Sequence, residues 1–212
     1  MDASHTKHKN WLLAAVHLGS LVPLALFGWA ALRGQLGYNP VETALRTSGR
    51  TAVALLLLSL SVTPLRIVLK RPSLHRLRKS LGLYAALYAG LHFVTFAVWD
   101  YGLRFQLIVL EFTHKPFLLL GLGALIILAI LAATSTRNWQ KRWPSGWHWL
   151  QRGVYLAAVL AVAHFLLAVK GDLLTLQGDY ARPLIAAGVL ILLFLLRVPR
   201  VQKWVQRLMN RS

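Results

Sequence analysis

The amino-acid sequence predicts an all-α membrane protein, a six-transmembrane-helix bundle with both termini cytoplasmic. Of the 212 residues, 57% are hydrophobic and only 14% are charged, a balance unlike that of a soluble globular domain. Apolar segments of about 20 residues, long enough to cross the hydrocarbon core as helices, recur along the chain. Lysines and arginines gather in alternate connections between these segments, as they do in membrane proteins.

Six spans are expected from the apolar segments. They cover residues 11–32, 48–69, 80–99, 116–136, 150–170 and 181–198. The second, fifth and sixth have short apolar cores, and arginines such as Arg50 and Arg197 extend them by reaching to the interface. No polar segment is long enough to build a second core, so residues 1–212 are expected to form a single domain.

The connections fit the same arrangement. Asn39 and Pro40 predict a turn before the second span. Residues 101–111 form a short amphipathic segment that we expect at the outer membrane surface. Residues 199–211 place apolar side chains at helical spacing among basic ones, which predicts an interfacial helix on the anionic lipid of the inner leaflet. A helix that docks a partner is the alternative for this last segment.

The charge distribution orients the bundle. The termini and the two connections on their side carry 17 of the 24 lysines and arginines, which marks that side as cytoplasmic. Five of the six acidic residues fall on the other side. Topology therefore explains the net charge of +18, and nucleic-acid binding is not expected. The absence of cysteine excludes iron–sulfur clusters and thiolate-ligated haem.

Two histidines lie deep inside the expected spans. His92 follows Lys79 by 13 residues and His164 follows Arg152 by 12, so both lie roughly 18–20 Å from the inner edge of the membrane core. Their helices run in the same direction, and two imidazoles at one depth are suited to axial ligation of a haem. Histidines that only pack, or hydrogen bond between helices, remain the alternative.

Other intramembrane features favour no competing chemistry. His17 lies in the first span without a companion at its depth, which favours a structural role, and His114 is expected at the outer surface. A transporter would be expected to carry acidic residues at mid-membrane, and no Asp or Glu lies inside an expected span. A non-redox membrane scaffold remains open on these residues alone.

Short fragments in a fixed order extend this interpretation. They are Asn39-Pro40-Val41-Glu42, Thr47-Ser48-Gly49, Thr63-Pro64-Leu65-Arg66, Arg78-Lys79-Ser80-Leu81-Gly82-Leu83, His92, Lys115-Pro116-Phe117, Thr134-Ser135, Trp147 with Leu150, Arg152 and Tyr155, and His164. Together they resemble the MsrQ (YedZ) family of the ferric-reductase-like transmembrane group, over nearly the whole chain.

The resemblance implies a haem b protein of the bacterial inner membrane that also uses FMN. It implies that the chain supplies electrons to MsrP, a periplasmic molybdopterin enzyme that reduces methionine sulfoxide in oxidised proteins. The family's haem ligands correspond to His92 and His164. Catalysis would belong to MsrP, so this chain is expected to be an electron-transfer subunit. The alternative is another ferric-reductase-like or cytochrome b-type oxidoreductase.

One departure from the family concerns a second, inner haem. The family commonly has Leu-His-Arg where this chain has Leu150-Gln151-Arg152, and Gln151 lies 13 residues before His164, where related proteins place the inner ligand. An amide is a poor iron ligand, and Lys79, at the matching offset before His92, offers no neutral nitrogen at ordinary pH. One haem per chain is therefore expected. His148 and His75 are the candidates for a displaced inner site.

Electrons must still cross the inner half of the membrane. FMN would meet that need, because arginine and lysine pair with phosphate and an indole stacks on a flavin ring. The candidate residues are Arg76, Arg78, Lys79 and Trp147, with ordinary positive-inside charge as the alternative. The chain ends 14 residues after its last expected span, so we expect the electrons to come from a separate cytoplasmic flavin reductase or from the quinone pool.

The outer face offers cationic partners for haem propionates. Arg46, Arg50 and Arg104 are the candidates, and interfacial anchoring is the alternative for each of them.

Overall fold

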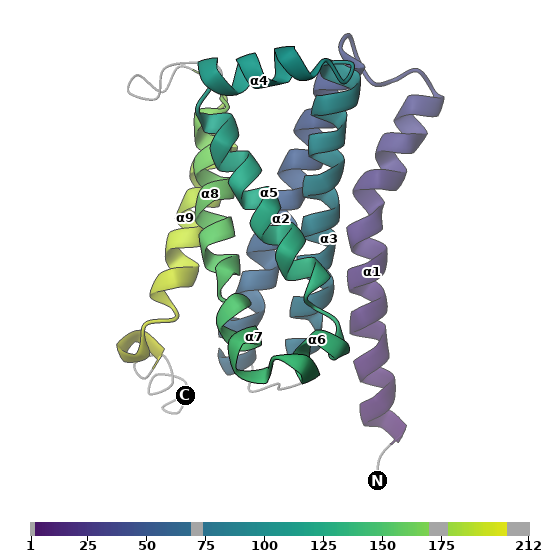
Figure 1. Ribbon diagram of the computed structural model, residues 1–212. Coiled ribbons are helices and arrows are strands. Elements are labelled where there is room, and N and C mark those ends of the chain that lie inside the picture. The colour runs from purple at the N-terminus through teal and green to yellow at the C-terminus, as the bar shows by residue number, and fades with distance from the viewer. Residues whose placement is uncertain (1–2, 69–73, 170–177, 203–212) are drawn as a thin grey trace.

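The computed structural model describes residues 3–68, 74–169 and 178–202. Within these ranges the regular structure is helical, without strands, which confirms the all-α fold class. The elements are α1 (Ala3–Leu32), α2 (Pro40–Val68), α3 (His75–Val94), its π-helical continuation η2 (Thr95–Asp100), α4 (Phe105–His114), α5 (Phe117–Ala133), α6 (Arg137–Arg142), α7 (Pro144–Leu150), α8 (Gly153–Leu167) and α9 (Ala181–Leu195). Figure 1 shows the long helices side by side, with α4 lying across one end of the bundle.

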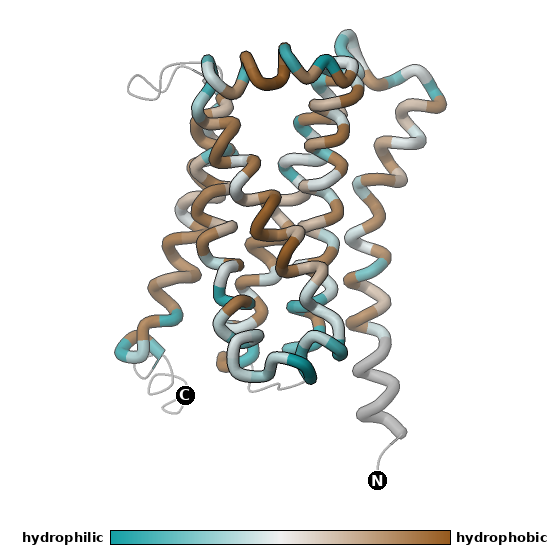
Figure 2. The backbone as a smooth tube through the Cα atoms, viewed as in Figure 1, coloured by the Kyte–Doolittle hydropathy of each residue, from teal (hydrophilic) through white to brown (hydrophobic). Residues whose placement is uncertain are grey.

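The two ends of the bundle differ. We refer to them as the α4 end and the α6–α7 end, after the short helices found there (Figure 1). Both ends of the described chain, at residues 3 and 202, lie at the α6–α7 end. Figure 2 shows apolar residues along the middle of the helices and polar residues gathered at both ends. This banding is the pattern of a multi-pass membrane protein.

Four helical segments are long and apolar enough to cross a membrane. They are Trp11–Leu32, Pro40–Val68, His75–Asp100 and Pro144–Leu167. The pair formed by α4 and α5 provides a fifth only if it is counted as one span, and these two helices are bent by 114°. α9 is apolar but has 15 residues, which is short for a crossing. The six-span count and the cytoplasmic placement of the termini therefore stay predictions.

Several helix boundaries differ from the expected ones. α2 begins at Pro40, eight residues before the expected span, because Asn39 caps it: the Glu42 amide donates to Asn39 Oδ1 at 3.1 Å. Proline fits the first turn of a helix, where no backbone donor is needed. α8 begins at Gly153, three residues after the expected start of the fifth span, and ends at Leu167; α7, which ends at Leu150, extends this segment toward the α6–α7 end. Of residues 199–211, only the first four lie in the described part of the chain, and they are helical.

The segment expected at the outer surface, residues 101–111, forms most of α4 and the turn before it. Gly102 and Leu103 both have φ of 57°, and this left-handed turn redirects the chain after η2. Lys115 Nζ lies 2.7 Å from Glu111 Oε2 and holds the pKa of that carboxyl below its usual range. Burial, together with Glu111, raises the pKa of the Tyr101 phenol to about 12. Glu111 of α4 thus interacts with a residue before the helix, Tyr101, and with one after it, Lys115.

The bundle is tightly packed toward the α6–α7 end. Leu60, Ala85, Ala157 and Ala158 are fully buried there, on α2, α3 and α8. The small alanines let these helices approach closely, which is how helices associate in membranes. α1 is peripheral: it packs mainly along α3 and leaves most of its surface outside the bundle (Figure 1).

Candidate functional site

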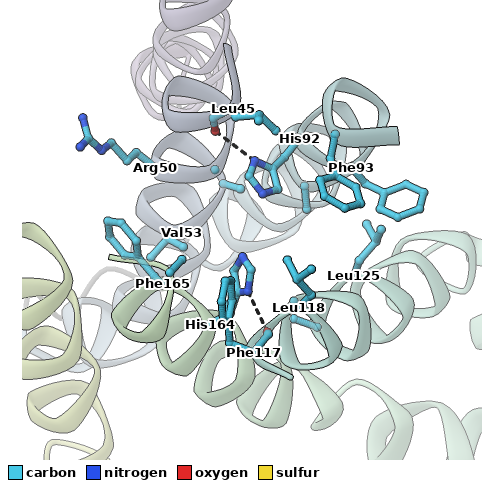
Figure 3. A pocket seen from close by; sticks show the side chains of 18 of the residues that line it. Leu45, Arg50, Val53, His92, Phe93, Phe117, Leu118, Leu125, His164 and Phe165 are labelled. Atoms are coloured by element: carbon cyan, nitrogen blue, oxygen red, sulfur yellow. Dashed lines mark hydrogen bonds between the residues drawn. The ribbon is translucent and has the colours of Figure 1, made fainter. Parts of the chain in front are cut away.

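A cavity of about 390 Å³ opens between α2, α3, α5 and α8 toward the α4 end. This volume is within the range of roughly 300–1,000 Å³ that is usual for cofactor and ligand pockets. Figure 3 shows its walls, which are mostly aliphatic and aromatic. Among the wall residues are Val53, Phe93, Phe96, Phe112, Leu118, Leu125, Ala161 and Phe165.

His92 and His164 lie in this cavity, facing each other. Their ring centroids are 6.2 Å apart and the ring planes make an angle of 76°. The sequence placed them at one depth on parallel helices, and the structure brings them into one cavity from α3 and α8. Such a pair in an apolar cavity is suited to ligate a metal between the two rings.

A backbone carbonyl fixes the orientation of each imidazole. His92 Nδ1 lies 3.0 Å from the Leu45 carbonyl oxygen, and His164 Nδ1 lies 3.0 Å from that of Phe117. A carbonyl only accepts hydrogen bonds, so Nδ1 is the protonated nitrogen in both rings. The lone pairs are therefore on the two Nε2 atoms, which point toward each other across the cavity (Figure 3).

Two glycines make room for these rings. A Cβ atom at Gly49 would lie 3.0 Å from His92 Nδ1, and one at Gly121 would lie 2.9 Å from His164 Nδ1 and Cε1. Each glycine also follows, by four residues, the carbonyl that its histidine contacts. Because a helical side chain covers the turn that precedes it, the missing side chain leaves that carbonyl accessible.

The residues present fit a haem iron. One ion bonded to both Nε2 atoms at about 2 Å would hold the ring centroids about 6 Å apart, which matches the observed separation. A carbonyl on Nδ1 is the usual outer partner of a metal-bound histidine, since it fixes the tautomer and makes Nε2 a stronger ligand. The apolar walls suit a porphyrin. Among the described residues, no group of three or more His, Asp or Glu side chains offers a competing metal site.

Two of the three arginines proposed for propionates line the cavity. Arg46 pairs with Glu42, with Nη2 to Oε1 at 2.7 Å, and Arg50 pairs with Asp179, with Nη2 to Oδ2 at 3.4 Å. The carboxylates show that these guanidinium groups can hold anions at the mouth of the cavity. Arg104 lies outside the cavity lining, in the turn that precedes α4.

Three of the residues proposed for an inner site contact the end of α5. Lys79 Nζ donates to the Ser135 carbonyl at 2.8 Å, and Trp147 Nε1 donates to that of Thr134 at 2.8 Å. Gln151 Nε2 donates to the Leu131 carbonyl at 3.3 Å. Leu131 lies in the last turn of α5, and Thr134 and Ser135 directly follow the helix, so these carbonyls lack helical partners and the three side chains supply donors to them. Each therefore has a structural role in place of, or in addition to, a cofactor role.

The other inner candidates are dispersed. His148 is exposed and its ring contacts Trp147 edge-on, with centroids 5.0 Å apart. His75 and Arg76 are exposed at the start of α3, and within the described ranges no hydrogen bond or ring contact joins His75 to His148. The Arg78 carbonyl accepts a hydrogen bond from Ser59 Oγ at 2.9 Å, which fixes the backbone there. These positions provide no assembled second site, and the inner-site and flavin assignments stay predictions.

The residues that orient the two histidine rings were not predicted from the sequence. Leu45 and Phe117 act through backbone atoms, which side-chain patterns do not reveal. The sequence does carry a signal: each glycine precedes its histidine by 43 residues, and the residue whose carbonyl accepts the histidine's hydrogen bond precedes it by 47. The two helix pairs, α2 with α3 and α5 with α8, thus repeat one arrangement.

Comparison with known families agrees with this geometry. Residues 48–162 match the family model described as the ferric reductase-like transmembrane component, which covers more than half of the chain. The match includes Gly49, His92 and Gly121 and ends two residues before His164. The chain therefore belongs to the ferric reductase-like transmembrane family, which gives it a role in electron transfer within a membrane.

Proposed function

We propose that the chain holds one b-type haem between His92 and His164 and passes electrons across the membrane through it. The observation that carries this proposal is the facing pair of imidazoles, each with Nδ1 bonded to a carbonyl and Nε2 free. Domains of this family generally bind haem, which supports the assignment. Bis-histidine haem iron cycles between the ferric and ferrous states and so carries one electron at a time.

The protein's own residues would hold this cofactor and keep its surroundings apolar. The carbonyls of Leu45 and Phe117 fix both imidazoles before the metal binds, so little rotational freedom is lost on ligation. The phenylalanine and leucine side chains of the walls would keep water away from the edges of the porphyrin. Arg46 and Arg50 at the mouth would pair with the propionates, and the haem would then lie in the half of the bundle nearest the α4 end.

The physiological setting is proposed from the resemblance to the MsrQ family. In this proposal the membrane is the bacterial inner membrane, the α6–α7 end is cytoplasmic, and residues 1–212 act as one domain. Electrons leave at the α4 end to a periplasmic MsrP-like molybdoenzyme that repairs oxidised methionine in proteins. They enter from a cytoplasmic flavin reductase, by way of FMN near Arg76 and Arg78, or from membrane quinol. The cluster of basic residues at the α6–α7 end supports binding of a phosphate-bearing flavin there.

The haem assignment is tested by absorption spectra of purified variants. We expect the wild-type protein to show a Soret band that shifts and sharpens on reduction with dithionite. His92→Ala and His164→Ala should each lose most of the haem, because each removes one axial ligand and its bond to a carbonyl. His114→Ala is the matched control: its Nδ1 bonds only the Leu110 carbonyl of its own helix, and its haem content should equal that of wild type.

Retention of the complete bis-histidine spectrum in both single variants would show that the ligands lie elsewhere. The acceptor is tested separately, by adding an MsrP-type enzyme and methionine sulfoxide to the dithionite-reduced protein. Reoxidation of the haem that depends on both additions supports the proposed partner. Reoxidation by oxygen alone would leave the family's electron-transfer role without this partner.

A further inference from the structure

A group of polar side chains lies on the seam between α1 and α3, outside the cavity. His17 Nδ1 and Tyr84 Oη are 3.0 Å apart, with the rings edge to face and their centroids 5.6 Å apart. One turn further on, Tyr88 Oη donates to the Ser20 carbonyl at 2.7 Å. Ser20 Oγ is buried and has no hydrogen-bond partner in the described structure. These groups belong to apolar segments, where polar side chains are costly and call for a functional explanation.

This seam is open to the lipid. α1 stands at the edge of the bundle (Figure 1), and only 6% of its most apolar stretch is buried. The His17 side chain is exposed, and no described residue hydrogen bonds to its Nε2. At Gly19, two residues on, a Cβ atom would meet nothing within 4 Å. A molecule dissolved in the bilayer can therefore reach His17 sideways, and a hydrogen bond from it would satisfy a nitrogen that otherwise faces hydrocarbon.

The seam is also near the cavity. Tyr84 precedes His92 by eight residues on α3, so the two lie about 12 Å apart along the helix axis. In the other direction His17 follows Asn10 by seven residues, which places it about 10 Å from the polar start of α1. An electron from this seam would travel one way, toward His92, and a proton the other way, toward the aqueous phase at the α6–α7 end.

We propose that His17 and Tyr84 bind an isoprenoid quinol and that its electrons enter the protein at this seam. The inference rests on the proposed function, because ferric haem between His92 and His164 is the oxidant. A quinol fits for three reasons: it is soluble in the lipid that surrounds α1, its hydroxyl groups hydrogen bond to imidazole and phenol, and its oxidation releases the electrons that the haem requires.

With Nδ1–H donated to Tyr84 Oη, His17 offers the lone pair of Nε2 to a quinol hydroxyl and takes its proton on oxidation. The quinol loses two electrons and two protons and becomes the quinone. The haem held by His92 and His164 would accept these electrons one at a time, passing the first to the acceptor before the second arrives. Both protons leave through His17 toward the α6–α7 end, one after the other.

The test is the rate at which decylubiquinol reduces the haem of the purified holoprotein under anaerobic conditions. We expect reduction in wild type, and slowing by about tenfold or more in His17→Ala and in Tyr84→Phe, since one lost hydrogen bond of about 1.4 kcal/mol corresponds to tenfold. Haem content and reduction by dithionite should not change in either variant, because neither residue lines the cavity.

Tyr88→Phe is the matched control. It removes the hydrogen bond between Tyr88 and Ser20 and leaves His17 and Tyr84 in place. Its rate of haem reduction by decylubiquinol should therefore stay within about twofold of wild type, a much smaller change than the roughly tenfold slowing expected when a hydrogen bond to the quinol is lost. Equal slowing in Tyr88→Phe and Tyr84→Phe would mean that the bonds only dock α1, and would overturn the quinol site.

The remaining outcomes separate the two proposals. A wild-type haem that dithionite reduces and decylubiquinol does not would overturn the quinol site and leave the proposed function intact. Unchanged rates in both His17→Ala and Tyr84→Phe would have the same meaning. A wild-type protein without a Soret band would overturn both, since the quinol would have no oxidant.

Discussion

At the scale of single residues, each proposed haem ligand depends on a glycine of the neighbouring helix. The ring of His164 lies against Gly121 and that of His92 against Gly49, so closely that a methyl group added at either glycine would come too near the imidazole. The same glycines leave accessible the carbonyls that orient the rings. Ligand geometry in this site is therefore set by the absence of two side chains as much as by the presence of two histidines.

Gly121→Ala and Gly49→Ala should both weaken haem binding. The added methyl group must displace an imidazole by a few tenths of an ångström or strain its bond to the carbonyl, at a cost of about 1–3 kcal/mol. The effect should be larger at Gly121, where the contact is shorter. Haem content by pyridine haemochrome assay and thermal stability of the holoprotein are the measurements.

Gly90→Ala provides the control on α3. A Cβ atom at Gly90 meets nothing within 4 Å, and replacing a helical glycine should stabilise the helix by roughly 0.5–1 kcal/mol. Normal haem content in all three variants would show that the rings have more freedom than the close contacts indicate.

The histidines were predictable from sequence because depth follows from counting residues after the last charge. The two glycines were not predicted, because the spacing of 43 residues that they share has a meaning only once α2 is paired with α3 and α5 with α8. The arginines illustrate the same limit. Charge and location favoured Arg46, Arg50 and Arg104 equally, and only the fold places Arg104 beyond the cavity lining.

At the scale of elements, three residues that the sequence suggested for a cofactor site have structural contacts at the end of α5. Lys79, Trp147 and Gln151 come from two different segments and donate to three carbonyls at or just beyond this end, those of Ser135, Thr134 and Leu131. A glutamine at 151 serves this purpose well, since its amide provides the donor that a carbonyl needs. The departure from the family pattern at this position thus has a structural consequence, the joining of α7 to α5.

Trp147→Phe should destabilise the protein by about 1 kcal/mol or more, because the Thr134 carbonyl loses its indole donor while the ring volume is largely kept. Thermal unfolding in detergent is the measurement. Trp149→Phe is the matched control: that indole is 72% exposed, and its replacement should change stability by less than about 0.5 kcal/mol. Equal effects of the two substitutions would contradict a specific role for Trp147.

Helix positions followed from the apolar pattern wherever that pattern dominates, as in α1 and α5. The apolar pattern did not predict the boundaries that polar side chains set. The first two turns of α2 carry Glu42 and Arg46, so hydropathy alone placed the start at residue 48. The π-helical turn Thr95–Asp100 gave no sequence signal, since a shift to wider hydrogen bonding depends on how Phe96 and its neighbours pack.

At the scale of the whole molecule, the bundle is hollow near the α4 end and packed near the α6–α7 end. The cavity lies among α2, α3, α5 and α8, whereas the fully buried Leu60, Ala85, Ala157 and Ala158, which we call the packed layer, lie on α2, α3 and α8 nearer the α6–α7 end. A second porphyrin in the packed half would have to displace Leu60, Ala85 and Ala157. Overpacking of a close-packed core is costly, so the packing argues for a single haem.

The pyridine haemochrome assay should therefore return one haem per chain. Gln151→His, which restores an imidazole at the inner position, should leave this ratio unchanged, because the packed layer and Lys79 remain. A ratio of two in the wild-type protein would contradict the expectation and would direct attention to His148 and His75.

The repeated arrangement in the two helix pairs has a consequence for assembly of the protein. α2 packs along α3 and α5 along α8, and each pair orients its own imidazole without help from the other. Ligation of one metal by both histidines would then join the two helix pairs. Because the metal binds only the folded arrangement, this ligation would stabilise the folded state. Loss of the cofactor should loosen the joint between the helix pairs first, with the helices themselves intact. Hydrogen exchange would report this as early labelling around the cavity, while the packed layer stays protected.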